Sequence, residues 1–198
     1  MRSSVAGAGA FIHCLLVAAA VFAADRITKY LIGVFIPVGG AVPGRDSFVK
    51  FLHVLNDGVA FSMFQGHRTP LIVLQSVLVA VIVVFMLIAY RRLIRRLPNG
   101  LTVMTAFSLM LGGGLGNLWD RVSTGLVTDF ISIGSFAVFN TADACLVAGC
   151  GLLILCMLRY KDPDAVAGKG SAADVIESGG RAEETIAAGD AADGDGTR

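Results

Sequence analysis

Two aspartates are the residues of this chain with the clearest potential for chemistry. Asp143 lies in the apolar run FNTADACLVAGCGLLILCML and has no lysine or arginine within four residues. Asp129 lies in the stretch that precedes this run and also lacks a nearby cation in the sequence. Because an ionised carboxylate in an apolar setting is costly unless another group pairs with it, we expect the two aspartates to lie together.

Two carboxylates in a partly dry site share a proton, because two neighbouring negative charges raise one pKa. One member can then activate a water while the other donates a proton, as in aspartic proteases. Other hydrolytic machinery is missing: there is no GxSxG motif, the cysteines lack a neighbouring base, and His13, His53 and His67 lack metal-ligand spacing. We therefore expect hydrolysis without a metal or a cofactor.

The segments that must position these groups are apolar and of membrane-spanning length. The chain has 198 residues and is 55% hydrophobic, and about 20 apolar residues cross a bilayer as a helix. We predict an all-α membrane protein with four transmembrane helices, at about 10–36, 70–90, 101–118 and 138–158. A small extracytoplasmic β-element is expected at about 41–69, where two aromatic and β-branched runs flank the turn-forming Asn56-Asp57-Gly58.

Orientation follows from four arginines in the short link between the second and third helices: Arg91, Arg92, Arg95 and Arg96. Basic residues favour the cytoplasmic side, so both termini are expected there and residues 37–69 and 119–137 outside. An alternative treats the N-terminus as a cleavable signal peptide, because Arg2 and the apolar run 10–24 resemble one.

Charge divides the chain into two parts. Residues 1–161 form the predicted peptidase domain, in which basic residues outnumber acidic ones, whereas the acidic segment 162–198 has too little apolar content to fold. We expect this segment to be a disordered and dispensable cytoplasmic tail. The four cysteines lie in apolar runs and are interpreted as small packing residues: Cys14, Cys145, Cys150 and Cys156.

Polar residues from three predicted helices collect at the outer edge of the membrane. With ~1.5 Å of rise per residue, Asp25 and Lys29 lie ~22 and ~28 Å along the first helix from residue 10. The pairs at i,i+3 or i,i+4 share a helix face: Asp25 with Lys29, Asn117 with Arg121, and Asn140 with Asp143. The glycines at 112–114 and 116 would allow close helix packing, so these faces are expected to form one site.

Simpler interpretations of several residues remain open. Asp25 and Lys29 could be only an ion pair within one helix, and Asn56 only a turn-former. Arg26 is most simply a side chain that extends toward the membrane surface, and Asp120 a solvated helix end.

Five short motifs occur in order: DRITK at 25–29, NDGVAF at 56–61, GGGLGNLWDR at 112–121, VTDF at 127–130 and FNTAD at 139–143. With these motifs the chain resembles the bacterial lipoprotein signal peptidases, or signal peptidase II, over about residues 15–158. The resemblance implies an intramembrane aspartic endopeptidase of the inner membrane with an extracytoplasmic β-cradle. Its partners would be membrane lipid and prolipoproteins, cleaved just before a diacylglyceryl cysteine, and no nucleic acid.

The resemblance also assigns site residues. It implies that Asp129 and Asp143 are the catalytic dyad and that the active site lies on the outer side of the membrane. Supporting or substrate-binding residues would be Asp25, Lys29, Asn56, Gly58, Asn117, Arg121 and Asn140. The loop departs from the family pattern at Asp57, where a small or hydroxyl residue is more usual, which affects substrate preference rather than the chemistry.

Two other functions would also account for part of this pattern. A small proton- or ion-coupled transporter would also use intramembrane carboxylates, but it predicts polar groups at the membrane midplane and a repeated architecture. The polar groups here lie at one edge, and no repeat is evident. A membrane scaffold without activity leaves Asp143 unexplained.

Overall fold

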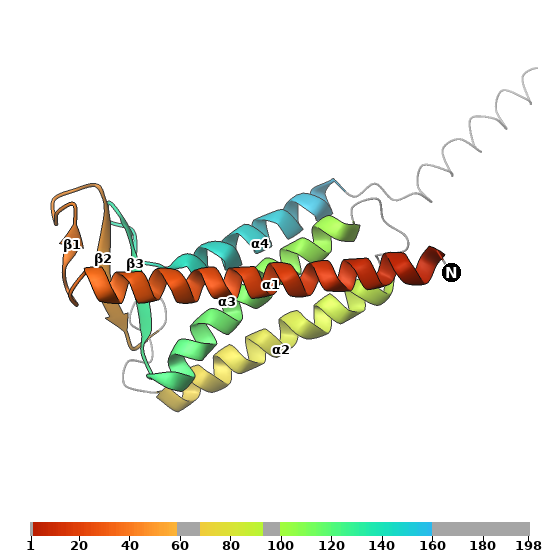
Figure 1. Cartoon of the computed structure of the whole chain (residues 1–198), viewed down its shortest axis with the longest axis horizontal. Helices are drawn as coiled ribbons and strands as arrows, with labels where there is room; N and C mark the ends of the chain where they lie inside the picture. The colour runs from red at the N-terminus through yellow and green to blue at the C-terminus, as the bar shows by residue number, and fades with distance from the viewer. Residues whose placement is uncertain (1, 59–67, 93–99, 160–198) are drawn as a thin grey trace, which may run out of the picture. The chain divides into compact units, whose positions relative to one another are not determined.

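The computed structural model describes residues 2–58, 68–92 and 100–159. In this part of the chain the helices are α1 (Arg2–Phe35), α2 (Arg68–Arg92), α3 (Gly100–Ser123) and α4 (Thr141–Leu158). The strands are β1 (Ala41–Val42), β2 (Val49–Asn56) and β3 (Val127–Ile133). Each helix is long and apolar enough to cross a membrane. The predicted fold class, four transmembrane helices with a small β-element, is therefore confirmed (Figure 1).

Helix α3 is the centre of the bundle, because α1, α2 and α4 all pack against it. Its glycines permit this close approach: a Cβ at Gly112 would lie 2.6 Å from the carbonyl oxygen of Ala18 in α1. The other three helices expose many large apolar side chains, such as Leu16, Val77 and Val147. Apolar surface of this extent suits contact with lipid rather than with water.

The three strands form one antiparallel sheet in the order β1-β2-β3. Figure 1 shows the sheet at one end of the helices, beside the C-terminal end of α1. A buried His53 in β2 contributes to this junction, since its Nδ1 lies 2.7 Å from the carbonyl oxygen of Ile36. The sheet is thereby fixed to the end of the bundle where the polar residues were expected.

Strand β3 corrects the expectation that residues 119–137 form an outer loop. The helix before it continues to Ser123, and the run VTDFISI then pairs with β2, with Asp129 opposite Val54. Its β-branched and aromatic residues, four of seven of the first kind and one of the second, are typical of a strand. The helix after it begins at Thr141 rather than at about 138.

Several predictions lie outside the described residues. They concern the run VAFSMF at 59–64, the side chains of Arg92, Arg95 and Arg96, and the tail at 162–198. Among the cysteines, Cys14 is buried in the apolar core as expected, and all four are free thiols.

Candidate active site

Asp143 lies in the first turn of α4 and takes part in the cap of this helix. The side-chain oxygen Oδ1 of Asn140 accepts a hydrogen bond from the backbone N–H of Asp143 at 3.0 Å. In return, Oδ2 of Asp143 accepts one from the backbone N–H of Asn140 at 3.2 Å. This reciprocal pair is a capping box, which satisfies two backbone donors that the helix itself cannot. One carboxylate oxygen of Asp143 is thus held in place.

Asp129 is brought to the same place by strand β3. Its Oδ2 accepts a hydrogen bond from Nδ2 of Asn56 at 2.8 Å, and its Oδ1 accepts one from Nδ2 of Asn140 at 2.7 Å. Burial of the side chain raises the pKa of Asp129 from 3.8 to about 6, although the hydrogen bond from Asn56 acts in the opposite direction. This carboxyl therefore holds a proton more readily than an ordinary aspartate.

Two buried amides connect the aspartates. Asn117 donates from Nδ2 to Oδ1 of Asp143 at 2.7 Å. The Nδ2 of Asn140 donates both to Oδ1 of Asn117, at 3.0 Å, and to Asp129. The resulting chain, Asp129–Asn140–Asn117–Asp143, brings together residues from β3, α3 and the start of α4. The expectation that these residues form one site is therefore supported by the geometry.

Both aspartates line a cleft of about 1180 Å³. Its walls come from α2 and α4, which both pack on α3 but have little direct contact with each other. Apolar side chains such as Leu78 and Val147 line it beside the polar groups at the sheet end. The cleft therefore offers an apolar groove that leads to a pair of carboxylates.

The supporting pair in α1 has more partners than the sequence indicated. Lys29 contacts Oδ2 of Asp25 at 2.9 Å, as the i,i+4 spacing predicted. Its ammonium also contacts Oδ2 of Asp120 at 2.8 Å and donates to Oδ1 of Asn117 at 2.9 Å. The pair is thus not only an ion pair within one helix, because it is joined to the amides that hold the aspartates.

Two of the simpler interpretations are wrong. Arg26 does not extend toward the membrane surface: its guanidinium contacts Asp25 at 3.0 Å and Asp120 at 2.6 Å. Asp120 is not a solvated helix end, because its carboxylate is buried between Arg26 and Lys29. The contact between Arg26 and Asp120 joins α1 to α3, so sequence spacing could not reveal it.

Arg121, expected as a supporting or substrate-binding residue, contacts the turn before the second helix. It donates to the carbonyl oxygen of Gly58 at 3.1 Å and to Oε1 of Gln75 in α2 at 3.4 Å. The turn at Gly58 is formed by Asn56, whose Oδ1 accepts the backbone N–H of Gly58 at 2.9 Å. Asn56 is therefore both a turn-former and a contact of Asp129. Gln75 was missed, although it is a long polar side chain within the apolar run of α2.

Gly116 allows Asp25 to lie against α3, because a Cβ at this position would be 2.5 Å from Oδ2 of Asp25. We expect Gly116→Ala to displace Asp25 and to lower the specific activity about tenfold, with a lower melting temperature in detergent. Gly151→Ala is the matched control, because no atom lies within 4 Å of a Cβ built there. Equal activities for the two variants would contradict the close approach at Gly116.

Comparison with known proteins decides the family. A family model described as signal peptidase (SPase) II matches residues 17–159. The chain belongs to the signal peptidase II family. The lipoprotein signal peptidase of Dehalococcoides mccartyi is 38% identical over 139 residues, which are 68% of this chain and 82% of that protein. The lipoprotein signal peptidase of Moorella thermoacetica is 39% identical over 142 residues, covering 72% and 89% of the two chains.

A solved bacterial membrane enzyme, determined by the in meso method at 1.9 Å resolution, has a similar fold. The TM-score is 0.63 at 30% sequence identity, over 75% of this chain and 94% of the other. The protein is therefore a membrane-spanning aspartic peptidase that cleaves the signal peptides of prolipoproteins. The resemblance found in the sequence is confirmed, and the transporter and scaffold alternatives are set aside.

Proposed function

We propose that Asp129 and Asp143 are the catalytic pair of this peptidase. The observation that carries the proposal is that both side chains line one cleft while the two amides of Asn117 and Asn140 connect them. One carboxyl, ionised, takes a proton from the attacking water, and the other, protonated, first stabilises the developing oxyanion and then supplies the proton for the leaving amine. The raised pKa of Asp129 suits it to the protonated role at the start of the reaction.

The substrate would lie in the groove between α2 and α4. An apolar signal segment fits the apolar lining, and the diacylglyceryl chains of the modified cysteine can stay in the bilayer beside it. The peptide bond just before the lipidated cysteine would then lie at the sheet end of the cleft, between the two carboxylates. This arrangement would let the enzyme cut at the membrane edge without removing the lipid from the bilayer.

The other residues of the site would hold this geometry. Asn56 and Gly58 form the turn at the mouth of the cleft, and Arg121 fixes this turn to α3. Asn117 and Asn140 set the separation and orientation of the carboxylates. Lys29 and Asp25 support these amides from α1, so that the reacting groups are fixed before substrate arrives.

The assay that tests the proposed function compares two substrates in detergent or vesicles. Purified enzyme should release the signal peptide from a prolipoprotein that carries the diacylglyceryl group, and mass spectrometry should place the cut just before the modified cysteine. The same prolipoprotein without the lipid should remain intact. Equal cleavage of both forms would contradict the proposed recognition of lipid, and cleavage elsewhere would contradict the proposed position of the bond.

We also propose that the enzyme lies in the bacterial cytoplasmic membrane with its site on the outer side. The support is the group of arginines at the end of α2 and in the link that follows it, which favours the inner side for that link. Residues 1–161 would form the peptidase domain, with 162–198 as an inner tail. Reporter fusions at about residues 55 and 125 should report an outer location, and fusions at about 95 and 165 an inner one. The mass of the intact protein tests removal of the N-terminus, and the reverse pattern of fusions would refute the orientation.

The pH dependence of turnover should report Asp129. If its protonated form starts the reaction, kcat/KM falls as the pH rises through about 6, because the carboxyl then loses its proton. Asn56→Ala removes a hydrogen bond that stabilises the carboxylate, so the pKa should rise and the alkaline limb of the profile should move to higher pH. Asp57→Asn is the matched control, because it keeps the Asn56 contact and removes a neighbouring negative charge, which cannot raise the pKa. An Asn56→Ala profile that stays in place or moves to lower pH would contradict the assignment.

A further inference from the structure

Four charged side chains of α1 and α3 form a closed ring beside the candidate active site. Arg26 contacts Asp25 at 3.0 Å and Asp120 at 2.6 Å, while Lys29 contacts Asp25 at 2.9 Å and Asp120 at 2.8 Å. We call Asp25, Arg26, Lys29 and Asp120 the charge ring. Its two negative and two positive charges cancel. Buried charges in an apolar setting require such pairing, because an unpaired one is costly.

Each contact that leaves the charge ring goes to a group next to one of the aspartates. Lys29 donates to Asn117, which in turn donates to Asp143. Oδ1 of Asp25 accepts the backbone N–H of Ala142 at 3.1 Å, one residue before Asp143. Oδ2 of Asp120 accepts the backbone N–H of Thr128 at 3.4 Å, one residue before Asp129. The charge ring therefore contacts the supports of both aspartates.

The charge ring does not take part in forming the cleft. Among the described residues that line the cleft, none is a member of the charge ring. Any effect of Arg26 or Asp120 on the reaction must therefore pass through other residues rather than through contact with substrate. This separates a role in positioning from a role in substrate binding, and the two make different kinetic predictions.

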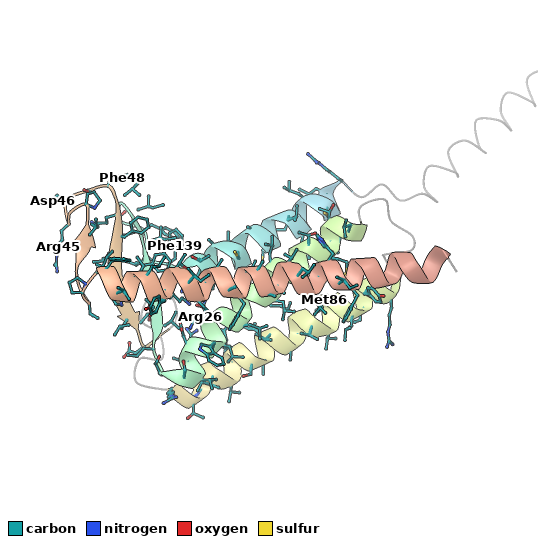
Figure 2. The ribbon with its side chains drawn as sticks, in the orientation of Figure 1. Arg26, Arg45, Asp46, Phe48, Met86 and Phe139 are labelled. Carbon is teal, nitrogen blue, oxygen red and sulfur yellow. The ribbon has the colours of Figure 1, made fainter. Side chains whose placement is uncertain are left out.

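Arg26 and Asp120 differ from Asp25 and Lys29 in what their removal would break. Without them, Asp25 and Lys29 would keep their own i,i+4 contact within α1. Lys29 would lose its second carboxylate partner, and the contact to the backbone of Thr128 would be lost as well, so the polar link from α1 to strand β3 would be broken. Figure 2 shows Arg26 toward the sheet end of the bundle, as Phe139 is, whereas Met86 lies toward the other end.

The geometry of Arg26 suits a bridge between two carboxylates. Its Nη2 contacts Asp25 and its Nη1 contacts Asp120, so one planar fork spans both groups. The Nε of Arg26 is buried and has no hydrogen-bond partner within the part of the chain that the structure describes. The position of the guanidinium thus gives both terminal nitrogens a carboxylate partner, while Nε is left without one among the described residues.

We propose that Arg26 and Asp120 are positioning residues for cleavage: they close the charge ring, which fixes Asn117 and Thr128 and thereby both aspartates. The proposal rests on the proposed assignment of Asp129 and Asp143 as the catalytic pair. It assigns a function to two side chains that the sequence analysis left without one. A peptidase with an open ring keeps its cleft and its substrate affinity but holds its carboxylates less well.

The test uses the full chain, a lipid-modified prolipoprotein and separate measurement of kcat and KM. Asp120→Asn and Arg26→Gln should lower kcat by about tenfold to a hundredfold, because small displacements of reacting groups have effects of this size. KM should stay within about twofold, because the cleft is unchanged. Arg26→Lys should retain more of kcat than Arg26→Gln, because a cation remains between the two carboxylates. Arg45→Gln, the same change at an exposed arginine in the turn between β1 and β2, should match the unchanged enzyme.

Thermal unfolding in detergent separates positioning from loss of folded protein. Arg26 is the informative site here, because its side chain is 26% exposed and a substitution there is better tolerated than at the buried Asp120. Unchanged kcat in Arg26→Gln and Asp120→Asn would overturn the proposal, as would a loss of kcat that only follows the loss of folded enzyme. A rise in KM with constant kcat would overturn it as well. Asp129→Asn and Asp143→Asn belong in the same assay, because activity in either of them refutes the proposed catalytic pair instead.

Discussion

Replacing either Asp129 or Asp143 by Asn should abolish prolipoprotein cleavage while the protein stays folded and inserted. Each carboxyl has to exchange a proton during the cycle, which an amide cannot do. The loss should be about a thousandfold or more, the scale of removing a positioned acid or base. The rate of signal-peptide release by purified enzyme measures it.

The design of the substitutions separates chemistry from structure. At position 143 the side-chain oxygen of Asn can still accept a hydrogen bond, so the start of α4 keeps part of its cap. At position 129 one of the two contacts, from Asn56 or Asn140, is lost. Asp46→Asn is the matched control, because Asp46 is exposed in the turn between β1 and β2, and Figure 2 shows it beside Arg45, away from Arg26. Near-normal turnover by either active-site variant would show that the pair is misassigned.

Much of the fold could be predicted because the membrane restricts the choices. Apolar length fixed the four helices, and the i,i+4 spacing of Asp25 and Lys29 correctly indicated their contact. The capping box at the start of α4 was also readable, since Asn140 and Asp143 have the N-cap and N3 spacing of that motif. It was not recognised, so Asp143 appeared to lie deeper in an apolar helix than it does.

The contacts between helices could not be predicted from spacing. Arg26 and Asp120 are 94 positions apart in the sequence, and their contact depends on how α1 and α3 rotate against each other. That rotation is set by packing details such as Asp25 against Gly116. The same limit applies to Arg121, because the carbonyl of Gly58 to which it donates lies 63 positions away in the sequence.

The site therefore has two sides with different requirements. On one side the cleft must admit an apolar segment, which requires that α2 and α4 have little contact with each other. On the other side the charge ring and the amides must hold two carboxylates, which calls for the close packing of α1, α3 and α4 that the glycines of α3 allow. Asn140 stands between these sides, because it is fully buried and contacts both aspartates.

Asn140→Asp should nearly abolish activity while the cap of α4 is retained. An aspartate at this position can still accept the backbone N–H of Asp143, since Asp and Asn are equally good N-caps. It cannot donate to Asp129 or to Asn117. Its own carboxylate oxygen would instead face the two acceptor oxygens of these residues and repel them. A lost hydrogen bond to an ionised carboxylate such as that of Asp129 is worth about 1.5–3 kcal/mol, and the bond to the neutral Asn117 is lost as well, so kcat should fall about a hundredfold or more. Steady-state kinetics with the lipid-modified prolipoprotein, together with melting in detergent, measure both effects.

The pH dependence of the Asn140→Asp variant provides an internal control. A protonated carboxyl is a donor again, so the residual activity of Asn140→Asp should rise as the pH is lowered, relative to the unchanged enzyme at each pH. Asn140→Ser also keeps a cap but has neither the amide donors nor the extra charge, so its activity should be low without this rise. If Asn140→Asp were as active as the unchanged enzyme, the amide of Asn140 would not be needed to hold Asp129. If it were inactive only because the protein fails to fold, Asn140→Ser would decide: full activity there would refute the role, and a folded variant with low kcat would support it.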